Sequence, residues 1–311
     1  MRHFDWRGHA LPLPDRLFRQ PFYVTHAGRE HVRPRQAYPH PGQPHYYDIS
    51  WGEGRILGEF CLSLITRGRG EIETKLGRQP IEAVQAWLYR PGEWHRHRPA
   101  YAIGWINHWI KFNGSLAHEW MQDGAFQLRG NRVPLADPKL FERQFRHLVA
   151  AIAAGKGRNS LQFAWEAIGL LSHFLVDRSS ADQPGVPKSG DAIVDAVRNY
   201  IWSQSHNQIS VTDVAHHTGL NRRTLERGFK AATGTTLFGE IQQCRLSRAT
   251  LLLRESDVPI KYVLSRTGFT SYQQLRLSFH KHFGRSPESY RSSHPSSVRT
   301  PEEARSGHGD R

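Results

Sequence analysis

The pattern of apolar and polar residues divides the chain into a β-rich first part and a helical second part. Between residues 20 and 113, short β-branched and aromatic runs are broken by turn residues. An example is "ILGEFCLSLITRGRGEIETKLG", which Gly68, Gly70 and Gly77 interrupt. The runs "AWLYRPGEWHRH" and "GWINHWIKF" follow at the spacing of a β sandwich or barrel. The first part is therefore predicted to be a β domain.

Two helices are predicted after these strands, because apolar residues then recur at steps of three and four. The apolar positions of the first helix are Leu140, Phe141, Phe145, Leu148 and Ile152. Those of the second helix are Leu161, Trp165, Ile168, Leu171 and Leu175. Each set is expected to lie along one face of its helix.

The remainder of the chain reads as a linker, a helical domain and a tail. Residues 178–190, "RSSADQPGVPKSG", lack periodicity and are rich in Ser, Pro and Gly, which is typical of a linker. The helical pattern resumes at residue 191, and the polar residues 295–311 are predicted to be disordered. The expected organisation is a β domain with a helical pair (1–177), a linker (178–190), an all-α domain (191–294) and a tail (295–311).

The all-α domain contains an internal repeat. "VTDVAHHTG" (211–219) recurs as "IKYVLSRTG" (260–268), and "LERGFKAATG" (225–234) recurs as "LRLSFHKHFG" (275–284). Each copy contains a short helix that ends at Thr-Gly, a turn, a polar cap at Asn221 or at Thr270 or Ser271, and a second helix. This is the layout of a helix-turn-helix, in which glycine lets the chain turn sharply. Two generic helical hairpins without a nucleic-acid role remain the alternative.

The second helix of the first copy separates into two faces at 100° per residue. Leu225 and Phe229 share the predicted buried side, and Gly228 beside them is expected to let a neighbouring helix approach closely. The outward residues are Arg223, Arg227 and Lys230, with Arg222 at the start and Glu226 on the flank. Arginine can pair with guanine and a carboxylate can accept from cytosine N4, so this face is able to address base edges. An ordinary ion pair of Glu226 with Arg222 or Lys230 is the simpler interpretation of the carboxylate.

The second helix of the second copy is predicted to bury Leu275 and Phe279. Its outward residues are Gln273, Arg276, Leu277 and His280, with Tyr272 at the entrance. Glutamine matches adenine and leucine can touch a thymine methyl group. Residues 237–256 between the copies are interpreted as one helix. About 17 of these residues at 1.5 Å per residue give a rod of roughly 25 Å, which could hold both second helices near successive major grooves.

Composition supports a polyanionic partner. The formal net charge of +14 and the pI near 10.2 leave nucleic acid and an anionic membrane as candidates. No apolar run is long enough to span a bilayer and the N-terminus has no secretion signal, so no membrane partner and a cytoplasmic location are expected. Cys61 and Cys244 are too few for a disulfide scaffold and wrongly spaced for a zinc cluster.

Residues 191–291 resemble the DNA-binding domain of the AraC/XylS family of bacterial transcription regulators. "VTDVAHHTGLNRRTLERGFKAATG", "RLSRATLLLRESDVPI" and "TGFTSYQQLRLSFHKHFGRSPESYR" carry the resemblance. Leu264 and Leu277 depart from it, because the family usually has a small residue and a basic residue there. By position in these motifs, the resemblance assigns base reading to Arg223, Glu226, Arg227, Tyr272, Gln273, Gln274 and Arg276. Double-stranded operator DNA is the implied partner and RNA polymerase is a further one. An activator role is one expectation, and a repressor role stays open.

The N-terminal part resembles the arabinose-type sensor of the same family, a cupin-like jelly roll followed by a dimerising helical pair. Residues 89–121 and the helices at 137–154 and 160–176 carry the resemblance. It implies a homodimer and a small effector, a sugar or polyol, bound in the jelly roll. The implied ligand-binding residues are Trp109, which would stack on the sugar, Asn107, His97 and Arg55. An ordinary core role for Trp109 and a regulator with a ligand-free sensor stay open.

The rival hypothesis is a metal-dependent cupin enzyme fused to a DNA-binding domain. His95 and His97 form a His-x-His of the kind that holds Fe, Mn or Zn. A cupin metal site also needs a nearby carboxylate, and "RPAYAIGW" after His97 contains none. We therefore expect no bound metal, no other cofactor and no enzymatic activity.

Overall fold

The computed structural model describes residues 5–11, 20–39, 51–52, 54–122, 125–126, 128, 131–155, 160–175, 190–204, 207–255 and 258–293. The chain forms two compact units. The first, here called the β domain, comprises residues 1–9 and 15–188, and the second, the helical domain, comprises residues 10–14 and 189–311. The linker and the tail expected from the sequence lie outside the described residues, apart from Gly190, which begins a helix.

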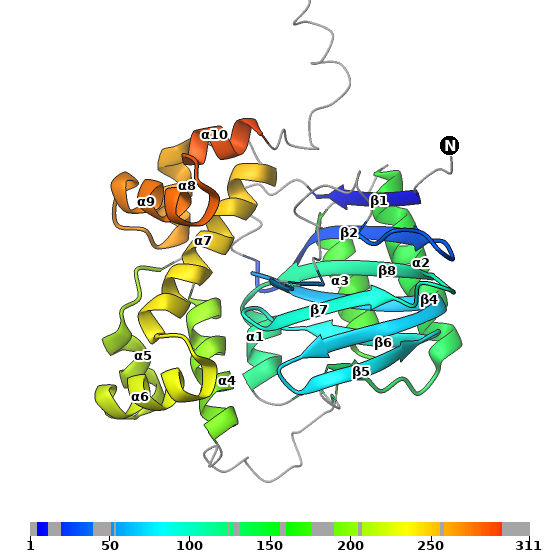
Figure 1. The fold of residues 1–311 in the computed structure, drawn as a ribbon, viewed down its shortest axis with the longest axis horizontal. Helices are drawn as coiled ribbons and strands as arrows, with labels where there is room; N and C mark the ends of the chain where they lie inside the picture. The colour runs from blue at the N-terminus through cyan, green and yellow to red at the C-terminus, as the bar shows by residue number, and fades with distance from the viewer. Residues whose placement is uncertain are drawn as a thin grey trace, which may run out of the picture. The chain divides into compact units, whose positions relative to one another are not determined.

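The β domain contains antiparallel strands, coloured from blue to green in Figure 1. They are β1 (Asp5–Ala10), β2 (Tyr23–Val32), β3 (Arg55–Ile56), β4 (Phe60–Thr74), β5 (Gly77–Glu82), β6 (Gln85–Tyr89), β7 (Trp94–Pro99), β8 (Trp105–Asn113) and β9 (Arg132–Val133). Neighbouring strands follow the order β1-β2-β8-β4-β6-β9, while β7 pairs with β3 and β4, and β5 pairs with β4. The predicted β architecture is confirmed.

Strand β4 belongs to two sheets. Its first half, from Phe60, pairs with β6 and β8, and its second half, Arg69–Thr74, pairs with β5 and β7. The change occurs at a register irregularity between Ile65 and Arg67, followed by Gly68 with φ +81°. A β-bulge next to a glycine in the left-handed region bends a strand sharply. The two halves of β4 therefore enclose the interior of the β domain from two sides.

Side-chain alternation along β8 separates this interior from the outer face. Trp105 and Trp109 belong to one buried apolar cluster with residues of both sheets, such as Ile72 and Ile81. The intervening residues of β8, Ile106 and His108, point to the opposite face. Helix α2 (Pro138–Ala154) packs against that outer face and contacts β2, β4 and β8, as Figure 1 shows behind the strands.

Helices α2 and α3 (Ser160–Leu171) form the expected pair, and α1 (Ser115–Gln122) precedes them. Helix α2 starts at the cap Asp137, ends at Gly155, and buries Phe141, Phe145, Leu148 and Ile152 as predicted. The predicted face of α3 is only partly right, since Leu171 is buried as expected but Leu161 and Trp165 are 49% and 65% exposed. The other buried residues of α3 are Phe163, Ala164, Ala167 and Leu170. The helix is apolar on two sides, and packing against α2 and β2 selects the side that the stripe of Leu161 and Trp165 does not occupy.

The helical domain consists of two halves joined by one long helix. Its helices are α4 (Gly190–Ser203), α5 (Val211–Thr218), α6 (Arg222–Thr233), α7 (Leu237–Glu255), α8 (Ile260–Thr267), α9 (Tyr272–Phe283) and α10 (Pro287–Ser292). Helices α4, α5 and α6 pack together and against α7, while α8, α9 and α10 contact other parts of α7. Helix α7 buries apolar residues along its length, among them Leu237, Ile241, Leu246, Ala249 and Leu253.

The internal repeat forms two helix-turn-helix units, α5–α6 and α8–α9. Both first helices end at a glycine in the left-handed region, Gly219 with φ +66° and Gly268 with φ +68°. Both second helices begin at a side-chain cap. Asn221 accepts from the backbone N–H of Arg223, and Ser271 accepts from that of Gln274. The predicted glycine turns and polar caps are confirmed, and Ser271 is the cap of the second copy.

Candidate nucleic-acid interface and ligand pocket

The interior of the β domain gathers aromatic rings and hydrogen-bonding groups. Strand β8 directs Trp105, Asn107 and Trp109 inward, since alternate residues share one face of a strand. Asn107 is buried and its Oδ1 accepts a 2.7 Å hydrogen bond from Ser63 Oγ on the neighbouring strand β4. The ring of Trp109 lies over Gly28 of β2, where an added Cβ would come closer than 3.0 Å to the indole. Because Gly28 has no Cβ, the indole of Trp109 can pack directly against the backbone of β2.

Two buried polar pairs lie further along the same interior. Trp105 Nε1 donates to Glu30 Oε2 at 3.2 Å, and the Tyr89 hydroxyl shares a 3.2 Å hydrogen bond with His97 Nδ1. Burial raises the pKa of Glu30 to about 7, although the bond from Trp105 and the nearby Arg55 charge both lower it. Burial lowers the pKa of His97 well below its ordinary value, and Arg55 lowers it further. His97 is therefore a neutral hydrogen-bonding group at pH 7.

Arg55 and His95 form a pair that bears on the metal hypothesis. Arg55 Nε donates to His95 Nε2 at 3.2 Å, and His95 Nδ1 lies 3.1 Å from the backbone carbonyl of Glu93, to which it can donate. Both imidazole nitrogens of His95 are thus engaged, and a metal ion would have to displace the arginine. In the described part of the chain, no three His, Cys, Asp or Glu side chains are grouped as a metal site would require. The donor set gives the His-x-His hypothesis no support.

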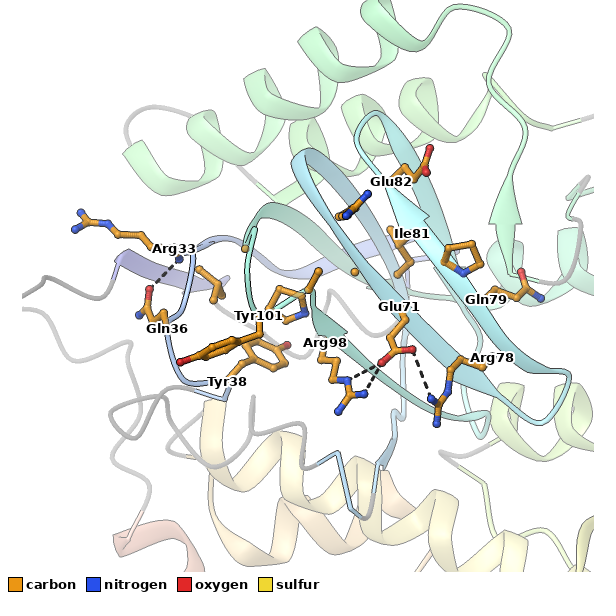
Figure 2. A pocket seen from close by; sticks show the side chains of 17 residues that line it. Arg33, Gln36, Tyr38, Glu71, Arg78, Gln79, Ile81, Glu82, Arg98 and Tyr101 are labelled. Atoms are coloured by element: carbon orange, nitrogen blue, oxygen red, sulfur yellow. Dashed lines mark hydrogen bonds and ion pairs between the residues drawn. The ribbon is translucent and has the colours of Figure 1, made fainter.

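A cavity of about 870 Å³ opens at the edge of this interior (Figure 2). Val32, Tyr38 and Ile81 line it, and all three also belong to or pack against the interior apolar cluster. The Tyr38 ring meets Trp105 edge-on at 5.8 Å between centroids. Figure 2 shows a chain of ion pairs on the same wall, in which Glu71 lies between Arg78 and Arg98. Tyr38 therefore lines the cavity and also lies against two interior rings, Trp105 and the predicted ligand residue His97.

The sequence-predicted ligand residues share this interior, but several interior groups were not predicted. Trp109 and Asn107 lie on β8, His97 on β7 and Arg55 on β3. Trp105 could have been found from alternation, because it lies on the same face as Asn107 and Trp109. Ser63, Glu30, Tyr89 and Tyr38 depend on strand register and loop position, which no local pattern reveals.

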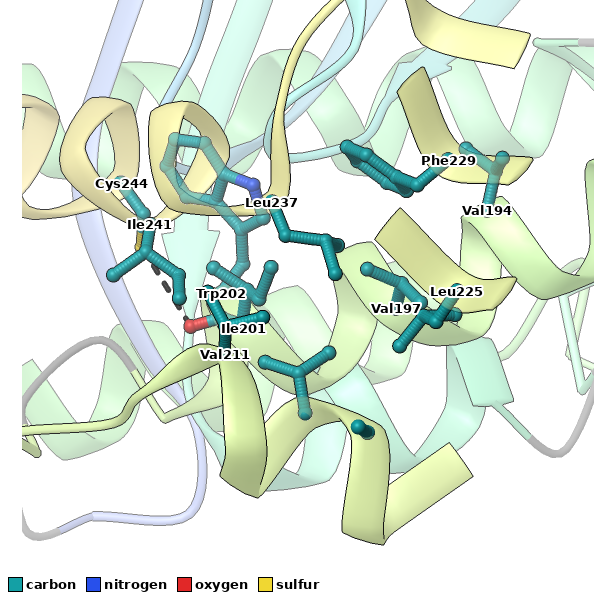
Figure 3. Close-up of a cluster of buried hydrophobic side chains, with 12 residues drawn as sticks. Val194, Val197, Ile201, Trp202, Val211, Leu225, Phe229, Leu237, Ile241 and Cys244 are labelled. Carbon is teal, nitrogen blue, oxygen red and sulfur yellow. Dashed lines mark hydrogen bonds between the residues drawn. The ribbon is translucent and has the colours of Figure 1, made fainter. Parts of the chain in front are cut away.

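The outward face of α6 is held in place by a buried core (Figure 3). Leu225 and Phe229 insert among Val194, Val197 and Leu237, which come from α4 and α7. Burying two such side chains stabilises the helix position by roughly 1.5–3 kcal/mol each. Arg223, Arg227 and Lys230 are exposed on the other side, as predicted. Gly228 is exposed and an added Cβ would meet nothing within 4 Å, so the predicted close helix approach at Gly228 is wrong.

The carboxylate on this face is paired. Arg222 Nε lies 3.4 Å from Glu226 Oε1, one helical turn away, and the two side chains are 59% and 42% exposed. Exposed pairs at this spacing contribute about 0.3–0.5 kcal/mol, so a partner with better geometry could displace Arg222. The pairing identifies Arg222, rather than Lys230, as the residue that orients Glu226 in the unbound protein.

The outward face of α9 is more varied chemically. Gln273, Gln274 and Arg276 are exposed, and Leu277 is 62% exposed, while Leu275 and Phe279 are buried as predicted. The Tyr272 hydroxyl donates to both carboxylate oxygens of Glu288 on α10, at 2.9 and 3.0 Å. This hydrogen bond raises the pKa of Tyr272 and fixes the ring at the start of the helix. Glu288 was not predicted as part of this surface, since it lies 16 residues away in sequence.

Helix α7 connects the two outward faces. Its 19 residues correspond to a rod of about 28 Å, close to the roughly 25 Å expected from the sequence and shorter than the ~34 Å helical repeat of DNA. No helix among the described residues has the length and apolar character needed to cross a bilayer.

Comparison with known proteins identifies relatives of both units. An AraC-like ligand binding domain matches residues 41–175, and a helix-turn-helix domain matches residues 214–293. The arabinose operon regulatory protein of Escherichia coli (strain K12) is 28% identical over 238 residues, which cover 75% of this chain and 80% of that protein. The multiple antibiotic resistance protein MarA of the same organism is 30% identical over 105 residues, 33% of this chain and 83% of MarA. The HTH-type transcriptional activator RhaS of Shigella boydii serotype 18 is 29% identical over 154 residues, 48% of this chain and 54% of RhaS.

Proposed function

The chain belongs to the AraC/XylS family of DNA-binding transcription regulators, and from that premise we propose that it regulates transcription in response to a sugar or polyol. The effector binds in the interior of the β domain, among Trp109, Asn107, His97 and Arg55. The relatives are regulatory proteins by name, and one of them is named for the arabinose operon. The proposal assigns this chain no enzymatic role, in accordance with those relatives.

The observation that carries the proposal is the combination of indole faces with neutral polar groups in one buried space. An indole face suits the C–H-rich side of a sugar ring, and Trp109 and Trp105 both face this interior. Asn107, Ser63 and the neutral imidazole of His97 offer donors and acceptors for hydroxyl groups. A hydroxyl-rich ligand satisfies such groups without introducing charge, which a buried site tolerates poorly.

DNA recognition is assigned to the outward faces of α6 and α9. On α6, Arg223, Glu226 and Arg227 read bases, while Arg222 and Lys230 contact phosphates. On α9, the base-reading residues are Tyr272, Gln273, Gln274 and Arg276. Their exposure supports this assignment, and so does the surplus of 14 Lys and Arg over 8 Asp and Glu in residues 191–294. The residue types match the donor and acceptor pattern of the major groove.

Dimerisation through the first unit is also proposed. Leu161 and Trp165 are one turn apart on α3 and largely exposed, so they form an apolar stripe that a second copy can cover. A dimer would place two helical domains on one operator. The family membership further supports action in the cytoplasm and, as an activator, contact with RNA polymerase.

Thermal-shift measurements against pentoses, hexoses and polyols test the ligand proposal. At least one sugar should raise the melting temperature of the wild-type chain, because a ligand that binds only the folded state stabilises it. Trp109→Ala should abolish that shift, and Trp109→Phe, which keeps an aromatic face at a smaller packing cost, should retain part of it.

Gel-shift binding to promoter DNA serves as the control. It should be unchanged in both variants without ligand, since Trp109 lies in the other unit. A panel with no shift in the wild-type chain would favour a regulator with a ligand-free sensor. A shift that survives in Trp109→Ala would place the sugar elsewhere.

A further inference from the structure

A second cavity, of about 1130 Å³, lies on the outer face of the sheet in the β domain. Its floor crosses adjacent strands. Arg29 on β2 is paired directly with His108 on β8, and Arg67 on β4 is paired with Ile106 on β8. Arg7 on β1 extends the row, because its backbone carbonyl lies against Gly28 of β2. Three arginines from three strands thus line one concave surface, here called the basic groove.

Helix α2 forms the wall of the basic groove. Lys139, Arg143 and Arg146 follow at steps of four and three residues, so they lie along one side of the helix. Ala150 and Ala153 continue this side with small side chains. Three strands and one helix therefore contribute six cationic side chains to the same cavity.

The described lining of the basic groove contains one carboxylate beside these cations. Glu142 alone is acidic among the described residues that line the cavity, and it pairs with Arg146 at 3.5 Å. Like charges on facing positions of a sheet or helix destabilise the fold. The helical domain also leaves much of the chain's charge unexplained, because residues 191–294 contain 14 of the 42 Lys and Arg and 8 of the 28 Asp and Glu. A concave surface lined mainly by basic side chains attracts anions.

His108 on the groove floor provides an independent observation. Its side chain is 5% exposed, it lines the cavity, and its Nδ1 is buried without a hydrogen-bond partner among the described residues. A buried polar atom left in this state costs about 1–3 kcal/mol. Burial lowers the pKa of His108 to about 4, and the charges of Arg29 and Arg146 lower it further. The ring is therefore neutral at pH 7, and its Nδ1 can donate to an anion oxygen when it carries the proton.

We infer that the basic groove is a binding site for a small molecule bearing one or more phosphate groups. Guanidinium groups form paired hydrogen bonds with phosphate oxygens, and arginines from separate strands and a helix can surround a tetrahedral anion. The cavity is in the size range of small-molecule sites, and a rigid DNA duplex could not bring its phosphates to the buried His108. The site is distinct from the proposed sugar site, because His108 and Asn107 are adjacent on β8 and point to opposite faces of the sheet.

Calorimetric titration of the full chain with inorganic pyrophosphate at low ionic strength tests the inference. Saturable binding with one site per chain is expected in the wild-type protein. Arg67 and Arg143 are exposed, so Arg67→Gln/Arg143→Gln should fold normally, and it should bind at least about tenfold more weakly. Arg223→Gln/Arg227→Gln on α6 removes the same charge from another surface and should keep the wild-type affinity within about twofold.

Three outcomes would overturn the inference. The first is no saturable binding of pyrophosphate to the wild-type chain. The second is an equal loss in both double variants, which would mean that pyrophosphate responds to total charge. The third concerns a short DNA duplex of random sequence. If Arg67→Gln/Arg143→Gln weakens duplex binding as much as pyrophosphate binding, the groove contacts the DNA backbone instead.

Discussion

The two helix-turn-helix units end their first helices in the same backbone conformation but in different surroundings. Gly219 and Gly268 both have φ near +67°, a region that costs L-residues with a side chain about 1–2 kcal/mol. Around Gly219 an added Cβ would meet nothing within 4 Å. At Gly268 it would lie closer than 3.0 Å to the carbonyl oxygen of Asn207, and 3.1 Å from Arg245 Nε. We therefore predict that alanine is tolerated unequally at the two equivalent positions.

The expected difference follows from these distances. Gly219→Ala should cost about 1–2 kcal/mol of unfolding free energy, from the backbone conformation alone. Gly268→Ala adds a collision with backbone, and overpacking of this kind typically costs about 1–3 kcal/mol more. Alanine also reduces the entropy of the unfolded chain, but by the same amount at both sites, so that contribution cancels in the comparison.

Scanning calorimetry of the full-length variants measures the difference. In a helical unit of this size, 1 kcal/mol corresponds to about 4–8 °C in melting temperature, so the transition of Gly268→Ala should lie at least about 4 °C below that of Gly219→Ala. Equal melting temperatures would refute the reasoning, because they would show that the segment around Asn207 moves aside at negligible cost. A lower melting temperature for Gly219→Ala would contradict the assigned surroundings of both glycines.

Four further predictions concern recognition, pH and assembly. Arg227→Ala should relax base preference in a selection from random DNA, whereas a uniform loss of affinity for all sequences would mean that Arg227 contacts only phosphate. Glu226→Ala should alter the preference at one base pair. An unchanged preference would mean that Glu226 only pairs with Arg222. The carboxyl of Glu30, whose pKa is raised from 4.5 to about 7, stabilises the fold fully below pH 4.5 and loses that contribution, about 3 kcal/mol, as the pH rises through 7. Glu30→Gln should therefore gain melting temperature relative to wild type between about pH 5 and about pH 8, and a constant difference would contradict the raised pKa. Trp165→Ser should weaken self-association in sedimentation experiments without reducing sugar binding, and an unchanged association constant would place the dimer interface elsewhere.

For the helical domain, the local pattern of apolar and capping residues was sufficient to predict the helix starts and the buried faces. Asn221 and Ser271 each precede a helix whose apolar residues recur four apart, so caps and buried faces followed from short sequence windows. The internal repeat made the glycine turns predictable, because Thr-Gly stands at the same position in both copies. Gly228 was misassigned because a glycine beside a buried stripe has two explanations, close packing or simple exposure, and spacing does not separate them.

Features that depend on tertiary packing were harder to predict. Helix α3 carries apolar residues on two sides, and periodicity alone gave no reason to prefer Phe163 over Trp165 as the buried residue. The basic groove was missed for a different reason. Its arginines are scattered from Arg7 to Arg146, and only the register of β2, β8 and β4 together with the docking of α2 brings them together. The polar partners inside the β domain, such as Ser63 for Asn107, required the same knowledge of register.

The bend in β4 lets this one strand contribute residues to several sites. Within about eight residues it supplies Ser63 to the interior, Thr66 and Arg67 to the basic groove, and Gly70 to the cavity at the interior's edge. The two halves of the strand meet at the irregularity before Gly68, which is the pivot about which one half can turn relative to the other. A ligand on one side of the sheet that changes the angle at this pivot also changes the spacing of groups on the other side. If a ligand does so, binding at the two proposed sites is coupled, and thermodynamic reciprocity requires an anion that alters sugar affinity to have its own affinity altered by the same factor.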